Sequence, residues 1–437
     1  MGLSLQESGT WLLALWERAL SKVQGDVLVE HSLKQFPERW QAGAGGRCIA
    51  LALGKAATAM AIGASRVLGS QLDEGLLITK TDHGSALPGW TTWEASHPVP
   101  DEASVRAGQL VMELAQNLGP HDRFLFLLSG GASSLCVAPV PGLGLEEKAR
   151  LGKALLHVGA SIHEMNCVRK HLSLCKGGGL RRLVSPAYGW TLALSDVPGD
   201  APDAIGSGPT VPDPTTFADA LSVLQAYHLT SSFPNIVHLL EQGVQGSLPE
   251  TLKHDEECEG LMDYDCLLSN SHLQTVLKQE AESVYPNCEA LGPLEVEVED
   301  LAVRVIERIK QSLNSEHPVM WVGGGEPTLV VQGEGLGGRM QHLGMLVSEG
   351  LAGQPGWFML AVGSDGTDGP TDAAGALVDG RTWNQVKVSG EDVMGLKASY
   401  DSYHYHHLGG SLVKTGPTGT HVGDIVLIVV QPVGAFS

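Results

Sequence analysis

Stretches of helical and strand-like hydrophobicity alternate along the whole chain. Between residues 4 and 40 apolar side chains recur at helical spacing, which predicts an amphipathic helix with its apolar stripe in a core. Short continuous apolar runs follow, most of them ended by glycine-rich segments, at residues 48–53, 75–79, 124–128, 188–194, 319–322, 357–362 and 425–430. Runs of this kind are typical of buried strands in parallel sheets. The pattern predicts an α/β fold.

The length of the chain and a polar segment near its middle predict two domains. A chain of 437 residues is too long for one ordinary core. The composition turns polar and acidic after residue 240, so we expect an N-terminal domain over residues 1–240, a connector over 241–262 and a C-terminal domain over 263–437. Each domain is predicted to hold a mostly parallel sheet covered by helices, with the active site in the cleft between the domains, at the carboxyl ends of the strands.

Charge and cysteine content exclude several classes of function. The chain has 28 Lys and Arg against 49 Asp and Glu, a net charge of −21, which argues against binding to nucleic acid or to an anionic membrane. No apolar run is long enough to predict a membrane span. The seven cysteines are odd in number and contain no C-x-x-C pair, which indicates free thiols in a reducing compartment. Because the N-terminus also lacks a secretory signal, we expect a cytoplasmic protein.

Residues 166–210 concentrate groups that can hold a polyphosphate and its divalent metal. Four potential cations come first: Arg169, Lys170, His171 and Lys176. The glycines Gly177–Gly179 follow, then a strand that ends before Asp196, with Asp200 and the loop Gly206–Gly208 close behind. Cations, exposed backbone amides and carboxylates are the groups required for such a ligand. The alternative is structural, since glycines also serve turns and an Asp after a strand also caps helices.

Two earlier strands deliver further candidate groups. Lys55 follows the first strand at the start of a helix, where a lysine can reach a phosphate, although a solvated lysine is the alternative. The segment Ser129–Ser134 follows another strand, and its small residues can form an anion-binding nest of amides. Neither G-x-x-x-x-G-K-[ST] nor G-x-G-x-x-G after a strand occurs in the chain, so the Walker and dinucleotide fingerprints are absent.

In the C-terminal half, Arg339 follows a glycine pair and is suited to bidentate binding of a carboxylate or phosphate. Asp365, Asp368 and Asp372 lie among glycines, where they can hold a metal or, equally, act as caps in a network of turns. A histidine cluster at 404, 406 and 407 is irregularly spaced, which favours a polar surface over a metal site.

Several long motifs resemble the class II glycerate kinases. The N-terminal half contains S-H-P-V-P-D-E-A-S (96–104), S-G-G-A-S-S (129–134), N-C-V-R-K-H-L-S (166–173), K-G-G-G-L (176–180), L-S-D-V-P-G-D (194–200) and G-S-G-P-T (206–210). The C-terminal half contains G-G-G-E-P-T (323–328), G-G-R-M-Q (337–341), G-S-D-G-T-D-G-P-T-D-A-A-G-A (363–376) and T-G-P-T-G-T-H-V (415–422), similar to that family's MOFRL domain. The resemblance runs from about residue 50 to residue 424.

The resemblance implies ATP- and Mg²⁺-dependent phosphorylation of D-glycerate to 2-phosphoglycerate, with ATP and glycerate as the partners. It implies that the catalytic residues are Lys55, Asp196 and Arg339, and that Asp196 and Asp200 hold the metal. Residues expected to bind the nucleotide are Ser129, Gly130, Gly131, Ser133, Gly177, Gly178, Gly179, Gly206, Ser207 and Gly208. Residues expected to bind glycerate are Asn166, Arg169, Glu326, Asp365 and Asp368.

Five positions depart from the family pattern. The family commonly has Asn and Glu where Met340 and His342 stand, Asn where Tyr400 and His421 stand, and Gly where Ala132 stands. Two alternative functions therefore stay open. An NAD(P)H-dependent hydroxypyruvate reductase is one, because some relatives carry that name, but it predicts the dinucleotide fingerprint that the chain lacks. A catalytically weak small-molecule-binding relative is the other, because it would tolerate the missing Asn and Glu after Arg339. The sequence does not determine the oligomeric state, with a homodimer among the expectations.

Overall fold

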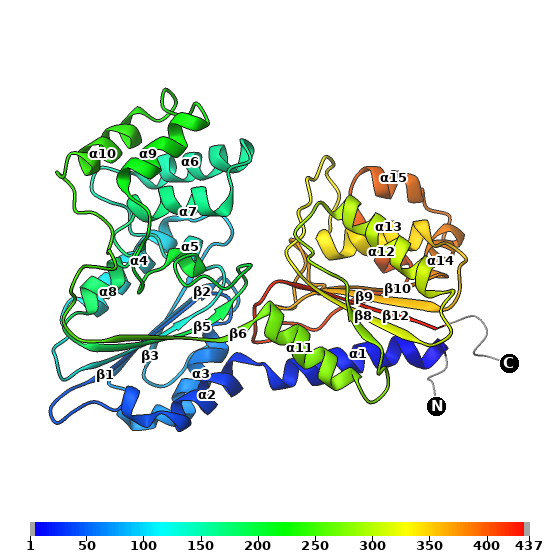
Figure 1. The fold of residues 1–437 in the computed structure, drawn as a ribbon, viewed down its shortest axis with the longest axis horizontal. Coiled ribbons are helices and arrows are strands. Elements are labelled where there is room, and N and C mark those ends of the chain that lie inside the picture. The colour runs from blue at the N-terminus through cyan, green and yellow to red at the C-terminus, as the bar shows by residue number, and fades with distance from the viewer. Residues whose placement is uncertain (1–4, 432–437) are drawn as a thin grey trace. The chain divides into compact units, whose positions relative to one another are not determined.

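The computed structural model describes residues 5–431, which fold into two compact units. The first, here called the parallel unit, comprises Gly25–Leu267. The second, here called the mixed unit, comprises Leu268 onward together with the chain up to Gln24. Each unit contains a sheet of six strands within the described residues (Figure 1). The α/β class with two domains is confirmed.

The sheet of the parallel unit has the strand order β3-β2-β1-β4-β5-β6. Its strands are β1 (Cys48–Leu53), β2 (Glu74–Lys80), β3 (Trp90–Ala95), β4 (Arg123–Leu128), β5 (Tyr188–Ser195) and β6 (Met262–Ser269). The pairs β3–β2, β2–β1, β1–β4 and β4–β5 are all parallel, and the central strands are buried along their length. This agrees with the continuous apolar runs that predicted them.

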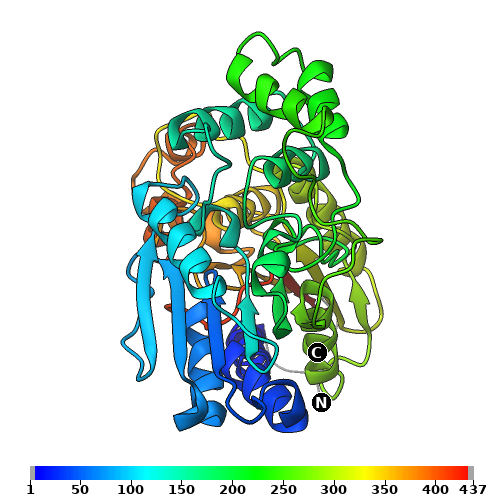
Figure 2. The ribbon, with the colours of Figure 1, turned by 90° about the vertical axis from the view of Figure 1, so that its left-hand side faces the viewer.

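Helices of the parallel unit form two groups. Those packed near the sheet are α2 (Gly25–Gln35), α3 (Ala57–Leu68), α4 (Glu102–Ala115), α5 (Ala132–Leu135) and α8 (Gly179–Val184). Those gathered beyond one end of the sheet, at the top of Figures 1 and 2, are α6 (Leu145–His157), α7 (Ile162–His171), α9 (Phe217–Ala226) and α10 (Pro234–Val244). The second group has its own apolar core, built around Leu151, Val168 and Phe217.

The sheet of the mixed unit corrects one part of the fold prediction. Its order is β11-β10-β9-β12-β8-β7, formed by β7 (Cys288–Ala290), β8 (Val319–Gly325), β9 (Trp357–Gly363), β10 (Gly375–Asp379), β11 (Leu412–Val413) and β12 (Asp424–Val430). Only β7–β8 is a parallel pair, because β12 runs antiparallel between β8 and β9, and β10 runs antiparallel to β9 and β11. Strand direction depends on pairing between distant segments, which hydrophobic periodicity does not report.

Helices cover this second sheet as expected. They are α1 (Leu5–Lys22), α11 (Asn270–Ala281), α12 (Val298–Ser312), α13 (Arg339–Gly350), α14 (Thr382–Val388), α15 (Val393–Ala398) and α16 (Ser402–Leu408). The main core lies between the sheet and α12 and α13, with Val305, Leu343 and Met359 among its fully buried residues. No described helix is both long and apolar enough to span a bilayer.

The compact units also differ from the predicted domain boundaries. The single helix expected over residues 4–40 is two helices, α1 and α2, which belong to different units. α1 packs in the mixed unit, where Trp11 contacts Tyr285 with ring centroids 4.9 Å apart and Lys22 pairs with Glu280 at 2.5 Å. Residues 241–267 stay with the parallel unit, because β6 adds to its sheet. Helix α6 ends at His157, and a separate helix, α7, begins at Ile162.

Candidate functional site

A cavity of about 370 Å³ in the parallel unit gathers residues from several of the predicted motifs. Its walls come from the loop 97–100, the segment after β4, and helices α6 and α7. Among the predicted site residues, Gly131, Ser133 and Arg169 line it. Segments more than thirty residues apart in the sequence therefore meet around one cavity.

Ser133, Ser207 and Asn166 form a chain of hydrogen bonds. Ser133 Oγ lies 2.9 Å from Ser207 Oγ, and the Ser207 hydroxyl also lies 3.1 Å from Asn166 Oδ1, to which it donates. Asn166 and Ser207 are buried, and Ser207 has a φ of 65°, a left-handed conformation that is costly for a residue with a side chain. Strain of this kind concentrates at functional sites. The structure thus brings together a predicted glycerate ligand and two predicted nucleotide ligands.

Lys55 lies against the glycine loop that follows β4. Its backbone N–H donates to the Gly130 carbonyl at 2.9 Å, and the Ser129 hydroxyl accepts the N–H of Ala56 at 3.1 Å. A Cβ at Gly131 would lie 3.2 Å from Lys55 Cγ and 3.1 Å from the His97 ring. Glycine at 131, with φ of 87°, therefore leaves room for both side chains.

The backbone of the Ser129–Ser134 loop retains free donors. Within the described residues, the N–H groups of Gly131, Ala132 and Ser133 have no hydrogen-bond acceptor, whereas Ser134 N–H donates to the Gly131 carbonyl. Free amides beside a lysine are suited to an anionic ligand. This agrees with the predicted nucleotide-binding role of the loop.

The three glycines Gly177–Gly179 do not support their predicted role. Gly177 N–H donates to the Ser207 carbonyl at 3.0 Å, Gly178 N–H to the Gly208 carbonyl at 2.8 Å, and Gly179 N–H to the Lys176 carbonyl at 3.0 Å. Their amides are therefore occupied. Glycine is required there for packing, because a Cβ at Gly178 would lie 2.2 Å from Leu252. These residues position the Gly206–Gly208 loop, in which Gly206 packs on Leu128.

Three cations line the cavity: Lys148, Arg169 and Lys176. Burial, followed by the charges of Lys176 and Arg169, lowers the pKa of Lys148 to about 7. Burial also lowers the pKa of Lys176 to about 8, with Arg169 acting in the same direction, and burial lowers the pKa of Arg169. Sequence reasoning identified Arg169 and noted Lys176, but it missed Lys148, which is one charged residue among several on an amphipathic helix.

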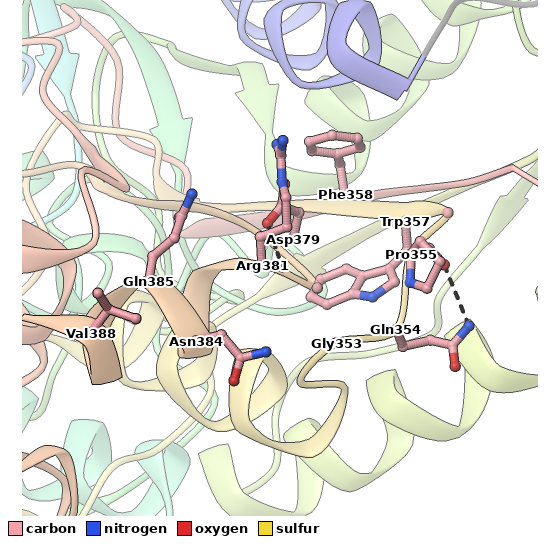
Figure 3. Close-up of a pocket in the computed structure, with 12 residues that line it drawn as sticks. Gly353, Gln354, Pro355, Trp357, Phe358, Asp379, Arg381, Asn384, Gln385 and Val388 are labelled. Carbon is pink, nitrogen blue, oxygen red and sulfur yellow. Dashed lines mark hydrogen bonds and ion pairs between the residues drawn. The ribbon is translucent and has the colours of Figure 1, made fainter.

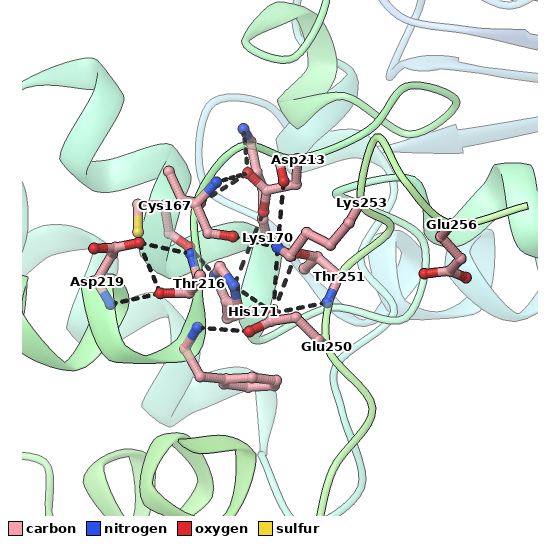
Figure 4. A network of polar contacts seen from close by, with 12 residues as sticks. Cys167, Lys170, His171, Asp213, Thr216, Asp219, Glu250, Thr251, Lys253 and Glu256 are labelled. Carbon is pink, nitrogen blue, oxygen red and sulfur yellow. Dashed lines mark hydrogen bonds and ion pairs between the residues drawn. The ribbon is translucent and has the colours of Figure 1, made fainter. Parts of the chain in front are cut away.

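The neighbouring cations of α7 belong to a separate, paired network (Figure 4). Lys170 Nζ lies 2.8 Å from Asp203 Oδ2 and 3.1 Å from Asp213 Oδ1. His171 Nε2 lies 2.9 Å from Glu250 Oε1. Consecutive positions on a helix point about 100° apart, so Arg169 faces the cavity while the next two residues face carboxylates. Lys170 and His171 thus serve the fold of this unit.

Asp196 and Asp200 lie on one turn after β5. Asp200 N–H donates to the Val197 carbonyl at 3.1 Å, Asp200 has a φ of 54°, and both aspartates are half-buried. Among the described residues, no three His, Cys, Asp or Glu side chains group as a complete metal site. Two carboxylates on one turn nevertheless fit Mg²⁺, which takes few protein ligands and completes its shell with water and phosphate oxygens.

In the mixed unit, Arg339 is the first residue of α13 and makes two ion pairs. Its Nε lies 2.5 Å from Asp424 Oδ2, and its Nη2 donates to Glu326 Oε1 at 3.0 Å. Burial raises the pKa of Asp424 to about 8, against the lowering effect of Arg339. Asp424 was missed as a candidate because it begins an antiparallel strand, whose amino end meets the carboxyl ends of β8 and β9 beside Gly325 and Gly363.

The predicted glycerate ligands Asp365 and Asp368 have different surroundings. Asp368 is buried and caps α13, accepting N–H groups of Met340 at 3.1 Å and Gln341 at 2.8 Å. Asp365 accepts from the Thr367 hydroxyl at 3.0 Å and pairs with His421 at 3.4 Å. The geometry therefore gives Asp368 a capping role in place of the predicted contact with glycerate.

The departures from the family pattern occupy defined places. Met340 is fully buried in the core of the mixed unit. The His342 ring stacks on Tyr400, with centroids 4.8 Å apart and planes 10° from parallel. Tyr400 has a φ of 61°, which explains why the family commonly has Asn there, since Asn tolerates this conformation better than Tyr.

A second cavity, of about 750 Å³, lies in the mixed unit and contains none of the predicted site residues (Figure 3). It is lined by Trp357 at the start of β9 and Asp379 at the end of β10, where Arg381 pairs with Asp379 at 2.6 Å. Asp365 follows the opposite end of β9. Size alone therefore does not identify the functional site, because this cavity lacks the reactive groups.

Comparisons with known proteins connect both units to described families. The model of a domain of unknown function, DUF4147, matches residues 11–241, and the MOFRL family model matches residues 319–424. A D-glycerate 2-kinase of Thermotoga maritima is 39% identical over 87% of this chain and 90% of its own length. A protein of Agrobacterium vitis named, provisionally, as a hydroxypyruvate reductase is 35% identical over 96% of this chain and 94% of its own.

A solved structure extends this similarity to the fold. The crystal structure of glycerate kinase from Thermotoga maritima matches with a TM-score of 0.82 and 35% sequence identity. The match covers 97% of this chain and 100% of that chain.

Proposed function

This chain belongs to the class II glycerate kinase family, and from that premise we propose how its residues phosphorylate D-glycerate with ATP. The observation that carries the proposal is the cavity of the parallel unit, which is lined by Gly131, Ser133 and Arg169, with Lys55 packed beside Gly131. A lysine, free amides and a guanidinium are the groups that neutralise and orient transferring phosphates.

The nucleotide phosphates bind the loop after β4. The free amides of Gly131, Ala132 and Ser133 donate to phosphate oxygens, and Lys55 neutralises the charge that develops during transfer. The Gly177–Gly179 segment has no direct contact in this scheme; it holds Ser207, whose hydroxyl links Ser133 to Asn166.

Asp196 is the proposed base. The 2-hydroxyl oxygen of glycerate forms a bond to the γ-phosphorus, the bond from that phosphorus to the β–γ bridging oxygen breaks, and ADP leaves. The hydroxyl proton passes to the Asp196 carboxylate. The alternative role of Asp196 is to hold Mg²⁺ together with Asp200; the metal, when bound, would supply charge neutralisation for the phosphates.

Glycerate binds through Asn166 and through the carboxylate-binding guanidinium of Arg169 or Arg339. In the mixed unit, Asp424 and Glu326 fix the Arg339 guanidinium and leave part of its planar fork for an anion. Placement of the active site in a cleft between the two domains stays a prediction, as does the cytoplasmic location.

The reductase alternative lacks its expected signal. After β1 the chain reads G-K-A-A-T-A, without the second and third glycines that bring a backbone close to a dinucleotide. The proposal is tested by supplying D-glycerate or L-glycerate with ATP and locating the phosphate on the product by phosphorus NMR. We expect 2-phosphoglycerate from the D-isomer; 3-phosphoglycerate, or no phosphorylated product from the D-isomer, would refute it.

A further inference from the structure

The cavity of the parallel unit contains more positive charge than its protein surroundings balance. Lys148, Arg169 and Lys176 come from different segments and line the same space. Among the described residues, none of the three forms an ion pair with a carboxylate, and the groups that favour the charge of Lys176 are the thiols of Cys136 and Cys175. By contrast, nearby Lys170 and Arg182 each pair with a carboxylate. Cations that are unpaired and partly removed from water lose their protons more readily, which is why the pKa values of both lysines are lowered, and a bound anion would restore their charge.

The two lysines that line the cavity differ in their contacts. Lys176 is only 5% exposed, and within the described part of the chain its side-chain ammonium donates no hydrogen bond, although its carbonyl accepts one from Gly179. Lys148 Nζ donates to the Leu172 carbonyl at 3.1 Å, which leaves two of its three N–H groups for a ligand. The buried apolar residues Val137 and Leu151 line the same cavity. Three cationic side chains thus share one partly apolar space.

The number of cations indicates the charge of the ligand. A carboxylate brings one negative charge and would leave three crowded cations with an excess of two. A phosphoryl group brings up to two negative charges and three acceptor oxygens, enough to bind all three side chains at once. We propose that Lys148, Arg169 and Lys176 form a dianion site for a phosphoryl group, an inference that rests on the proposed kinase function.

Two molecules in the reaction carry this group: the nucleotide and 2-phosphoglycerate. Titration calorimetry on the full chain at low salt distinguishes them, with inorganic phosphate, ADP, 2-phosphoglycerate and D-glycerate as separate ligands. Lys148→Met should lower the affinity for inorganic phosphate by at least about tenfold, which is the scale of one lost charge-assisted hydrogen bond. One of the two ligands, ADP or 2-phosphoglycerate, places its phosphoryl group in the site, and the variant should lose the same factor of affinity for that ligand. Its affinity for D-glycerate should be unchanged.

Control variants separate the site from general effects. Lys148→Arg should restore most of the phosphate affinity, and Lys310→Met, at an exposed position of α12, should leave all affinities unchanged. Without ligand, Lys148→Met should melt at or above the wild-type temperature, because it removes one of three crowded cations. The proposed site would be overturned if Lys148→Met kept its phosphate affinity, or if its affinity for glycerate fell as much as its affinity for phosphate. It would also be overturned if Lys148→Arg did not restore phosphate affinity, or if Lys148→Met clearly lost thermal stability.

The same measurements keep this inference separate from the proposed reaction. If wild-type protein binds phosphate through Lys148 but does not phosphorylate glycerate, the dianion site stands and the kinase assignment fails. If the wild-type protein phosphorylates glycerate and Lys148→Met binds every phosphate ligand normally, the kinase assignment stands and the dianion site fails.

Discussion

His171 and Glu250 form an ion pair inside the parallel unit, with 2.9 Å between Nε2 and Oε1, that joins α7 to the segment after α10 (Figure 4). Glu250 also accepts N–H groups of Phe217 at 3.0 Å and Thr251 at 2.8 Å. Burial opposes the charge on His171, but contacts with the Cys167 carbonyl and Glu250 outweigh it and raise the His171 pKa to about 9. The pair therefore makes stability depend on pH.

The sign follows from the raised pKa of His171. Its stabilisation is fully present below the unfolded pKa of about 6.5 and is lost as the pH rises through about 9. We expect the free energy of unfolding to fall by about 2–3 kcal/mol across that range. Denaturant unfolding at several pH values measures this, and His171→Gln should flatten the alkaline decline. An identical decline in the variant would assign the pH dependence to other groups.

Asp196→Asn tests the proposed base. The amide keeps the shape of the side chain but accepts no proton, so turnover should fall by about a hundredfold or more. Thermal unfolding should stay close to wild type, because the residue lies on a half-buried turn. A loss of only a few-fold, or an unfolded variant, would return Asp196 to a structural role.

Arg339→Lys keeps the charge and removes the planar fork. If the guanidinium binds glycerate or the phosphoryl group, kcat/KM should fall by an amount that corresponds to a loss of roughly 2–4 kcal/mol in transition-state stabilisation. Lysine still pairs with Asp424, so the change in melting temperature should be small. Arg339→Met is the informative comparison, because it leaves buried Asp424 without its cation and should lower stability as well. Wild-type kinetics in Arg339→Lys would remove this residue from catalysis.

Replacing Met340 and His342 by the residues common in the family should affect stability in two different ways. Met340→Asn places an amide in a fully buried core position and should cost about 1–3 kcal/mol of stability. His342→Glu removes the ring that stacks on Tyr400. The change in the free energy of unfolding that it causes should therefore differ by about 0.5–1.5 kcal/mol between the wild-type and the Tyr400→Asn background. A double-mutant cycle by denaturant unfolding measures this. Additive effects would show that the stacked rings do not interact energetically.

Local patterns were sufficient to predict some features of this molecule. Apolar runs located most strands, and glycine loops after them located Gly131, Ser133 and Ser207, because strand ends and tight turns depend on neighbouring residues. Contacts between distant segments were not predictable in this way. The carbonyls of Ser207 and Gly208 occupy the amides of Gly177 and Gly178, and that pairing leaves no local pattern.

The same limit explains the other errors. Antiparallel insertion of β12 beside β8 and β9 brings Asp424 to Arg339, and strand order is not encoded in periodicity. Lys148 occupies an ordinary polar position on α6, and only the fold shows that it shares a cavity with Arg169 and Lys176. Motif resemblance supplied Lys55, Asp196 and Arg339 as candidate catalytic residues, whereas the geometry showed which backbone amides and cations have no partner among the described residues.

The most direct test of the central claim supplies both candidate substrates to the purified full chain. One reaction contains D-glycerate, ATP and magnesium; the other contains hydroxypyruvate and NADH, and both ADP and NADH are followed. The account predicts ADP release that requires D-glycerate, stops with excess chelator and returns with magnesium, with no oxidation of NADH. Oxidation of NADH by hydroxypyruvate without glycerate-dependent ADP release, or undiminished phosphorylation in excess chelator, would contradict it.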